Sequence, residues 1–394
     1  MGSIKPYYTK SGKKMWKVRW DYYDPATGDR RQPEKRGFKK ERDAKDYLTK
    51  MEAHKLKKQY PTEDITVSDY LDLWLEQHVY RNISPTAQGS YKAFVQHAKD
   101  HIGGLKLSQV TRHHIREMYI DLHKNGRMKP YKDDDGETVT GLRHTSIRRI
   151  HDTLRTAFNH AIRDGYIYTN PTKDVTLPRG PAFEPRIYDA EEMGKAINIL
   201  RDEYLFMPVA LTAAWALRLG EALGFCFDDA NYDDDIASLR HEWVYDSINK
   251  KPFMSDTLKT DGSATTMPIE KWMKDLLRAE EKRHMENRLF LGEKYAKTEY
   301  NFVCRRPDGR PFHPKTYTQS FQRALKRGGL DKIRFYDLRH SVASILHAEG
   351  YSMRFIQDYL RHKDIRTTMG YYTHIFESKK KEAAAILDNI FEAK

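Results

Sequence analysis

The sequence has few cysteines and no long apolar segment. Its 394 residues include two cysteines, Cys226 and Cys304. This pair can form neither a disulfide framework nor a closely spaced metal-binding motif, which fits a reducing compartment. No run of about 18 apolar residues is present, and the N-terminus has no apolar signal core. The sequence therefore predicts a soluble protein of the bacterial cytoplasm without a membrane segment.

Acidic residues are outnumbered by basic ones, and the excess is local. The formal net charge is +13, and the first 60 residues contain 18 lysines and arginines against 8 aspartates and glutamates. Most of the excess therefore lies at the N-terminus, among interleaved aromatic residues. Such a segment favours a polyanionic partner such as DNA, which would make the protein nucleoid-associated. A solvated basic arm that only aids solubility is the alternative.

Length and the absence of internal repeats predict two or three domains, mainly helical with small sheets. Residues 1–60 alternate over 14–23 and 30–38 around a turn and end in a helix at 40–58, which predicts a small sheet packed on one helix. Such a sheet could enter a major groove. The basic residues expected to contact DNA there are Lys14, Lys17, Arg19, Arg30, Arg31, Lys35 and Arg36.

Residues 64–172 are predicted to be nearly all helix, with cap residues at Thr66, Ser84 and Thr111. The segment 125–141 is polar and glycine-rich, so an irregular loop is expected there. The helix at 145–164 has an apolar face and a basic side, which either lies on DNA or is simply solvated. Its basic residues are Arg148, Arg149 and Arg155.

Prolines and glycines between 173 and 187 predict a linker, and 188–394 is expected to be a mixed α and β domain. Short strands are predicted at 236–239 and 242–245, and a hairpin around 260–263. Within this domain the order of the candidate catalytic side chains is informative. Arg218, Lys259, Arg339, His362 and Tyr372 follow one another along the chain. A neutral phenol attacks only where nearby groups stabilise the charge it creates, so this set suggests chemistry on a phosphodiester.

The motifs around these residues resemble those of the tyrosine recombinase, or phage integrase, family. The family's first motif, Thr-Gly-x-Arg-x-Gly-Glu, matches around Arg218 with Ala216 in place of glycine. Its hairpin motif, a Lys-Thr pair followed by proline after seven residues, matches at Lys259 and Pro268. The third, His-x-x-Arg-His, matches at Arg339 and is preceded by Tyr336 in place of histidine.

The family's last motif, Leu-Gly-His followed by Tyr-x-His, matches at His362 and Tyr372, with Arg361 in place of glycine. The spacing from His362 favours Tyr372 over its neighbour Tyr371 as the nucleophile. Four motifs in the right order form a specific signal. The likeness covers 182–394 well and extends less specifically to the N-terminal half, where the family often has an arm-site-binding domain of a small sheet plus helix and a helical core-binding domain.

The resemblance implies a site-specific recombinase that cuts and rejoins DNA through a 3′-phosphotyrosine, without a cofactor or metal ion. Arg218 and Arg339 would bind the non-bridging oxygens as forked donors, and His362 would add another donor. Lys259 on a hairpin would protonate the leaving 5′-oxygen. The role of Tyr336 stays open, because a phenol accepts a proton less readily than an imidazole.

Two further residues are expected to support this set. Glu221 would orient a catalytic side chain or its helix, and His340, next to Arg339, would support that arginine. The resemblance also implies double-stranded DNA with core and arm sites as the partner, a homotetramer on that DNA, and an accessory DNA-bending or directionality protein. An amphipathic helix is expected at 379–391. The resemblance implies that it docks on a neighbouring protomer, and packing on its own domain is the alternative. Two other functions remain open, a topoisomerase-like or resolving enzyme and a silent DNA-binding regulator. A metal-dependent nuclease is disfavoured, because no acidic cluster accompanies the motifs.

Overall fold

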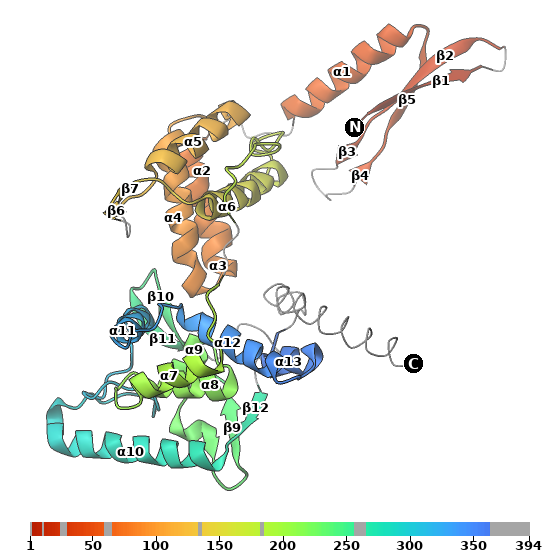
Figure 1. Ribbon diagram of the computed structural model, residues 1–394. Coiled ribbons are helices and arrows are strands. Elements are labelled where there is room, and N and C mark those ends of the chain that lie inside the picture. Colours follow the sequence, from red (N-terminus) through yellow and green to blue (C-terminus); the bar gives the residue numbers. More distant parts are fainter. Residues whose placement is uncertain are drawn as a thin grey trace, which may run out of the picture. The chain divides into compact units, whose positions relative to one another are not determined.

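The chain divides into two compact units, residues 1–181 and 182–394. The computed structural model in Figure 1 describes residues 2–9, 12–23, 30–58, 65–132, 136–181, 185–255 and 265–362. Helices predominate and the sheets are small, so the predicted fold class is confirmed. In the described part of the chain, no helix combines the length and the apolar character needed to span a membrane.

The N-terminal part is a three-stranded antiparallel sheet covered by one helix. The strand order is β1-β2-β5, with β1 at Ser3–Tyr8, β2 at Lys14–Arg19 and β5 at Glu34–Phe38. Helix α1 (Glu41–Lys58) packs on one face, where Val18 and Ala44 are fully buried. The predicted long first strand is interrupted, since Tyr22–Tyr23 (β3) pairs separately with Arg30–Arg31 (β4). Strand β1 was not predicted.

The second part of this unit is a helical bundle. Its helices are α2 (Val67–Trp74), which continues through a π-helical turn into α3 (Tyr80–Asn82), α4 (Pro85–Ile102), α5 (Arg112–Asn125) and α6 (His144–Arg163). The Thr66 and Thr111 hydroxyls accept hydrogen bonds from the backbone at Asp69 and His114 and so cap α2 and α5. The loop predicted to be irregular contains a two-strand pair, β6 (Tyr131–Lys132) with β7 (Thr138–Val139).

The C-terminal unit packs helices around two small sheets. Its helices are α7 (Ala190–Leu200), α8 (Phe206–Trp215), α9 (Leu219–Gly224), α10 (Lys271–Leu291), α11 (Pro314–Arg327), α12 (Phe335–Ala348) and α13 (Met353–Tyr359). One sheet has the order β12-β9-β8, and the other pairs β10 with β11. The strands are β8 (Ala230–Asn231), β9 (Ile236–Leu239), β10 (Glu242–Asp246), β11 (Lys251–Ser255) and β12 (Thr265–Pro268).

The hairpin predicted around residues 260–263 lies outside the described residues. Within the described residues, β11 pairs with β10 and β12 pairs with β9. The segment that joins β11 to β12 therefore connects two different sheets. Periodicity and a turn signal identify strands, but they do not identify which strand pairs with which, because pairing is decided by long-range packing.

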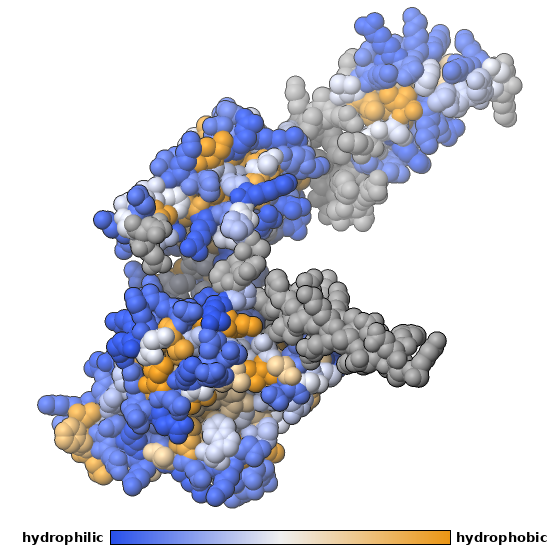
Figure 2. All heavy atoms as spheres, viewed as in Figure 1, coloured by the Kyte–Doolittle hydropathy of each residue, from blue (hydrophilic) through white to orange (hydrophobic). Residues whose placement is uncertain are grey.

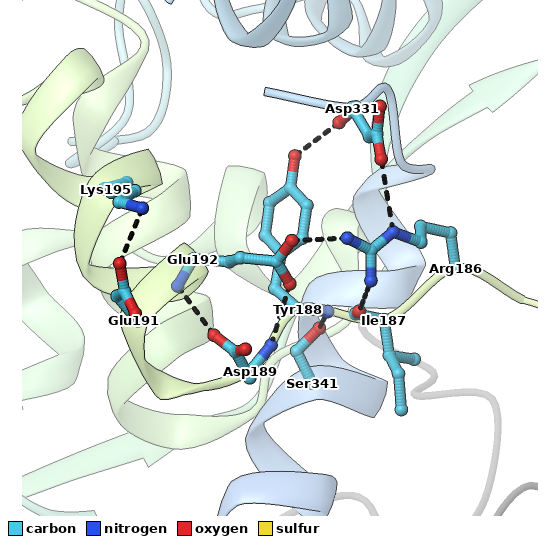
Figure 3. Close-up of polar contacts among 9 residues, drawn as sticks. All are labelled: Arg186, Ile187, Tyr188, Asp189, Glu191, Glu192, Lys195, Asp331 and Ser341. Atoms are coloured by element: carbon cyan, nitrogen blue, oxygen red, sulfur yellow. Dashed lines mark hydrogen bonds and ion pairs between the residues drawn. The ribbon is translucent and has the colours of Figure 1, made fainter. Parts of the chain in front are cut away.

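Hydrogen bonds and ion pairs connect Arg186 and Tyr188 to α12, to the segment before it and to α7 (Figure 3). The backbone N–H of Tyr188 donates to the Ser341 hydroxyl at 2.8 Å, and the Tyr188 hydroxyl donates to the Asp331 carbonyl at 2.5 Å. Arg186 forms ion pairs with Asp331 and Glu192. The chain is thus held against the helix that also carries Arg339.

The surface in Figure 2 is mainly hydrophilic, with an apolar patch at the C-terminal end of α10. Met285, Leu289 and Phe290 are exposed there, the last at 88%. The cores lie inside the units, and both cysteines, Cys226 and Cys304, are buried free thiols.

Candidate active site

A buried carboxylate, Glu221, organises the turn between α8 and α9. Helix α8 ends at Trp215 and is followed by Ala216, whose φ of 48° is left-handed. The backbone N–H of Arg218 donates to the Glu221 carboxylate at 2.9 Å, and the Arg218 guanidinium donates to it at 2.5 Å. Glu221 is 2% exposed. Burial raises its pKa, but Arg361 and Arg218 outweigh that effect, and the net pKa is lowered.

Arg339 extends from α12 toward the same turn. It is completely buried, and its Nη1 donates to the Ala216 carbonyl at 2.6 Å. Its Nε and Nη2 are buried as well and have no hydrogen-bond partner among the described residues. Burial lowers the pKa of Arg339, and the nearby Arg218 and Arg361 lower it further. A buried guanidinium with free donors and cationic neighbours has the chemistry to bind an anion.

Arg361 completes the cluster and was not predicted to do so. Its guanidinium donates to Glu221 at 2.8 Å, to the Trp215 carbonyl at 3.1 Å and to the Ala216 carbonyl at 3.4 Å. Two guanidiniums therefore bond to one carboxylate and Arg339 lies close enough to influence its pKa, so the cluster has a net positive charge. The sequence places an arginine beside His362 where the family motif has glycine. It does not reveal which way that side chain points.

The two histidines near the cluster are uncharged at neutral pH. Burial, followed by Arg339 and Arg218, lowers the pKa of His362 to about 3. Burial is also the main reason why the pKa of His340 is lowered to about 4. The Tyr336 ring lies edge-on to the His340 ring, with centroids 4.8 Å apart, and Tyr336 is 37% exposed. His362 is thus a neutral imidazole, which both donates and accepts.

The predicted site residues are therefore partly brought together. Arg218 and Arg339 lie beside Glu221, and His362 is close enough to both arginines for their charges to lower its pKa. Lys259 and Tyr372 lie outside the described residues, as do Tyr371 and the predicted helix at 379–391.

The basic residues of the N-terminal sheet are divided between its two faces. Cross-strand pairing aligns Lys5, Lys17 and Arg36 on the face away from α1, where Arg19 also lies. Lys14 and Lys35 share the face that carries Val18 and packs on α1. Lys35 lies over the Tyr47 ring of that helix, with its Nζ 4.3 Å from the centroid. Lys5 was not predicted, and the side chains of Arg30 and Arg31 lie outside the described part.

The open face of this sheet has a shallow pocket lined by Ser3, Lys5, Lys17, Arg19 and Glu34. Lys17 forms an ion pair with Glu34 at 3.1 Å. In the helical bundle, all three basic residues predicted on α6, Arg148, Arg149 and Arg155, are exposed. This exposure fits both a DNA-facing side and a solvated one.

The cluster in the C-terminal unit is the type of site that binds an anionic phosphate, and the N-terminal sheet carries a basic face. Sequence profiles of known families match the chain in three places. The Arm DNA-binding domain matches residues 6–55, the phage integrase N-terminal SAM-like domain matches 66–123, and the phage integrase family matches 186–379. The chain belongs to the phage integrase family, whose members are tyrosine recombinases.

Individual relatives agree with this assignment. A tyrosine recombinase XerC-like protein of Caldanaerobacter subterraneus is 24% identical over 346 residues, which is 84% of each chain. The ICEBs1 integrase of Bacillus subtilis is 27% identical over 64% of this chain and 67% of its own length.

Solved structures show the same fold. The Tn1549 transposon integrase, in complex with a circular intermediate DNA, has a TM-score of 0.63 at 18% identity and covers 82% of this chain and 99% of its own. A lambda integrase dimer bound to a core site has a TM-score of 0.53 at 19% identity and 93% coverage of both chains. A lambda integrase tetramer bound to a Holliday junction has a TM-score of 0.51 at 19% identity, over 91% of this chain and 95% of its own.

Proposed function

We propose that this recombinase cleaves and rejoins DNA strands through a covalent bond between Tyr372 and a 3′-phosphate, and that it integrates or excises a mobile element. The observation that carries the proposal is the buried arginine cluster, in which Arg339 has two guanidinium nitrogens without a partner among the described residues. Those donors suit the non-bridging oxygens of a phosphodiester.

The reaction is a transesterification. The Tyr372 oxygen attacks phosphorus and passes its proton to solvent water. The bond from phosphorus to the 5′-oxygen breaks, and that oxygen takes a proton from the Lys259 ammonium. The phosphodiester energy is kept in the phosphotyrosine, so a 5′-hydroxyl from another strand can attack it and reverse the steps. Arg218 and Arg339 stabilise the charge that develops on the non-bridging oxygens.

The neighbours of the two arginines have supporting roles. Glu221 fixes the direction of the Arg218 guanidinium, and His362, as a neutral imidazole, donates one hydrogen bond to the phosphate. Tyr336, partly exposed and packed on His340, adds a hydroxyl donor. Replacement of Tyr336 by phenylalanine should therefore reduce cleavage less than replacement of either arginine.

The partners follow from the family and from the basic surfaces. We infer that the bundle, through α6, binds the core site around the cut, and that the open sheet face with Lys5, Lys17 and Arg36 binds a separate arm site. The lambda integrase tetramer on a Holliday junction supports assembly of four protomers on two duplexes. An accessory protein that bends DNA would bring arm and core sites together.

The test is covalent capture. The purified chain is incubated with a pool of nicked duplexes of random core sequence, and denaturing gels reveal protein joined to DNA. We expect an adduct with the wild type in the presence of a chelator, and no adduct with Tyr372→Phe. Tyr371→Phe is the matched control and should retain the adduct. An adduct that persists in Tyr372→Phe would disprove the assigned nucleophile.

Recombination distinguishes this function from the alternatives. The captured sequences are placed on two plasmids, and the products are scored by size. Joint molecules are expected from a recombinase, whereas supercoil relaxation without joint molecules would identify a topoisomerase-like enzyme. Specific binding without any cleavage would identify a regulator.

A further inference from the structure

Arg361 has a backbone conformation that arginine rarely adopts. It follows α13, and the end of this helix is a Schellman motif: the N–H of Arg361 donates to the Asp358 carbonyl and the N–H of His362 to the Gln357 carbonyl, both at 3.0 Å. The φ of Arg361 is 53°, in the left-handed region that favours glycine. Such a conformation costs about 1–2 kcal/mol in a residue with a side chain, and it persists where the surroundings determine it.

The surroundings that determine it are the contacts of the Arg361 side chain. The side chain is 3% exposed, so it does not reach a bound duplex at the surface. Its oxygen partners, on Trp215, Ala216 and Glu221, belong to the segment that contains Arg218, and a further contact reaches the Met267 sulfur on β12 at 3.9 Å. Arg361 therefore ties the end of α13 to the turn between α8 and α9.

Two of these partners, Ala216 and Glu221, are shared with arginines of the candidate site. The Ala216 carbonyl accepts from Arg339 as well as from Arg361, and the Glu221 carboxylate accepts from Arg218 as well as from Arg361. Ala216 is itself left-handed. Two residues in this uncommon conformation are thus joined through one guanidinium.

The same contacts place the residue that follows. His362 comes directly after Arg361, and its backbone is held on both sides by Gln357, whose carbonyl accepts at 3.0 Å and whose side chain donates at 2.9 Å. Because Arg361 is held by its side-chain contacts, the backbone of His362 has a fixed position beside the arginine cluster.

From this network we propose that Arg361 is a positioning residue for strand cleavage, one that holds Arg218, Arg339 and His362 in register around the same phosphate. The proposal rests on the proposed function. A displacement of about 1 Å in groups of this kind can reduce a reaction rate by about 10²-fold.

The experiment uses the full chain and a nicked duplex whose core sequence has been captured from the random pool by the wild type. Single-turnover adduct formation and duplex affinity are measured for Arg361→Gly and Arg361→Lys. Glycine suits the backbone torsion, so this variant removes the side chain without adding strain. We expect Arg361→Gly to bind the duplex within about 3-fold of the wild type and to cleave about 10²-fold more slowly. Arg361→Lys, which keeps the charge but not the fork, should recover part of the rate.

A second substrate separates positioning from folding. A methylphosphonate at the scissile position has one charged oxygen fewer, so its cleavage depends less on well-placed arginines. The rate deficit of Arg361→Gly is therefore expected to be smaller on the methylphosphonate than on the phosphate. A purely structural defect would lower both rates equally. Arg305→Gly is the matched control, because Arg305 also binds backbone carbonyls, those of Tyr300 and Phe302, and should leave the rate unchanged.

Each outcome has one meaning. The positioning role is overturned if Arg361→Gly cleaves within about 2-fold of the wild-type rate, or if its rate deficit is equal on both substrates. In either case an adduct formed by the wild type still supports the proposed function. If the wild type itself forms no adduct that depends on Tyr372, both proposals fall.

Discussion

At the scale of single residues, the site contains a conflict between stability and function. Arg339 is completely buried and is bonded to one carbonyl, and its neighbours include Arg218 and Arg361. A buried cation with so few partners does not stabilise a fold, because the loss of hydration outweighs what one hydrogen bond returns. Its presence is understandable where an anion is to be bound.

The first prediction follows from this conflict. Arg339→Met should leave the free energy of unfolding unchanged or raise it by about 1–2 kcal/mol, and should slow adduct formation by about 10²-fold or more. Urea unfolding and single-turnover cleavage measure the two effects. Sulfate should raise the melting temperature of the wild type more than that of the variant, because it binds the cluster. A loss of about 3 kcal/mol in the variant would instead show that Arg339 has a structural role.

A second prediction concerns pH. The pKa of His340 is about 4 in the folded chain and about 6.5 in the unfolded chain, so between these values the unfolded chain binds a proton that the folded chain does not. The stability due to neutral His340 is thus fully present above pH 6.5 and falls by about 1.4 kcal/mol per unit as the pH decreases. His340→Gln should lack this contribution. If the free energy of unfolding in urea changes equally from pH 7 to 5 in the wild type and in His340→Gln, the role of neutral His340 is refuted.

At the scale of elements, α12 joins the start of the unit to the site. The Ser341 hydroxyl on this helix accepts a hydrogen bond from the backbone N–H of Tyr188 (Figure 3). Arg339 lies on the same helix. Burial raises the pKa of Tyr188 to about 12, so its hydroxyl stays protonated and keeps donating to Asp331. Arg186 and Tyr188 therefore help to hold α12 and the segment that precedes it in place.

The third prediction tests this support. Ser341→Ala leaves the buried N–H of Tyr188 without its acceptor and should lower the free energy of unfolding by about 1–3 kcal/mol. Glu191→Ala is the matched control. It removes an exposed ion pair with Lys195 within α7 and should lower the free energy of unfolding by less than about 1 kcal/mol. Thermal or urea unfolding compares the two variants. Equal losses would show that the bond to Ser341 does not support α12.

At the scale of the whole molecule, charge is concentrated at one end of the chain. The first 60 residues contribute +10 of the net +13, as 18 basic against 8 acidic residues. On the open sheet face, Lys5, Lys17 and Arg36 form a cross-strand row. A row of this kind binds phosphates without reading bases, so its contribution depends on salt.

The fourth prediction follows from this distribution. Replacement of Lys5, Lys17 and Arg36 by glutamine should weaken binding to long duplexes and reduce the slope of log affinity against log salt by up to about 3. Adduct formation on a short core duplex should not change. Lys14 and Lys35, on the side that packs on α1, provide the control double variant, with a smaller change in slope. Equal changes in slope per charge removed would contradict the assignment of faces.

The sequence predicted the elements better than their pairing. Cap residues such as Thr66 and Thr111 identified helix starts, since capping is a local interaction. The partners of β11 and β12 were not predicted, because strand pairing depends on distant segments. The face on which Lys14 and Lys35 lie was likewise not predicted, since a charge pattern does not reveal which face of a sheet a helix covers.

By itself, the sequence determined the family, the order of the motifs and the residue types that phosphodiester chemistry requires, because these depend on identity and spacing along the chain. Only the tertiary structure decided that Arg361 turns inward to Glu221 and the Ala216 carbonyl. That direction depends on a left-handed turn after α13 and on a second one after α8. Both turns are held by contacts between residues about 140 positions apart, such as Arg361 with Glu221, and such contacts exist only after the chain has folded.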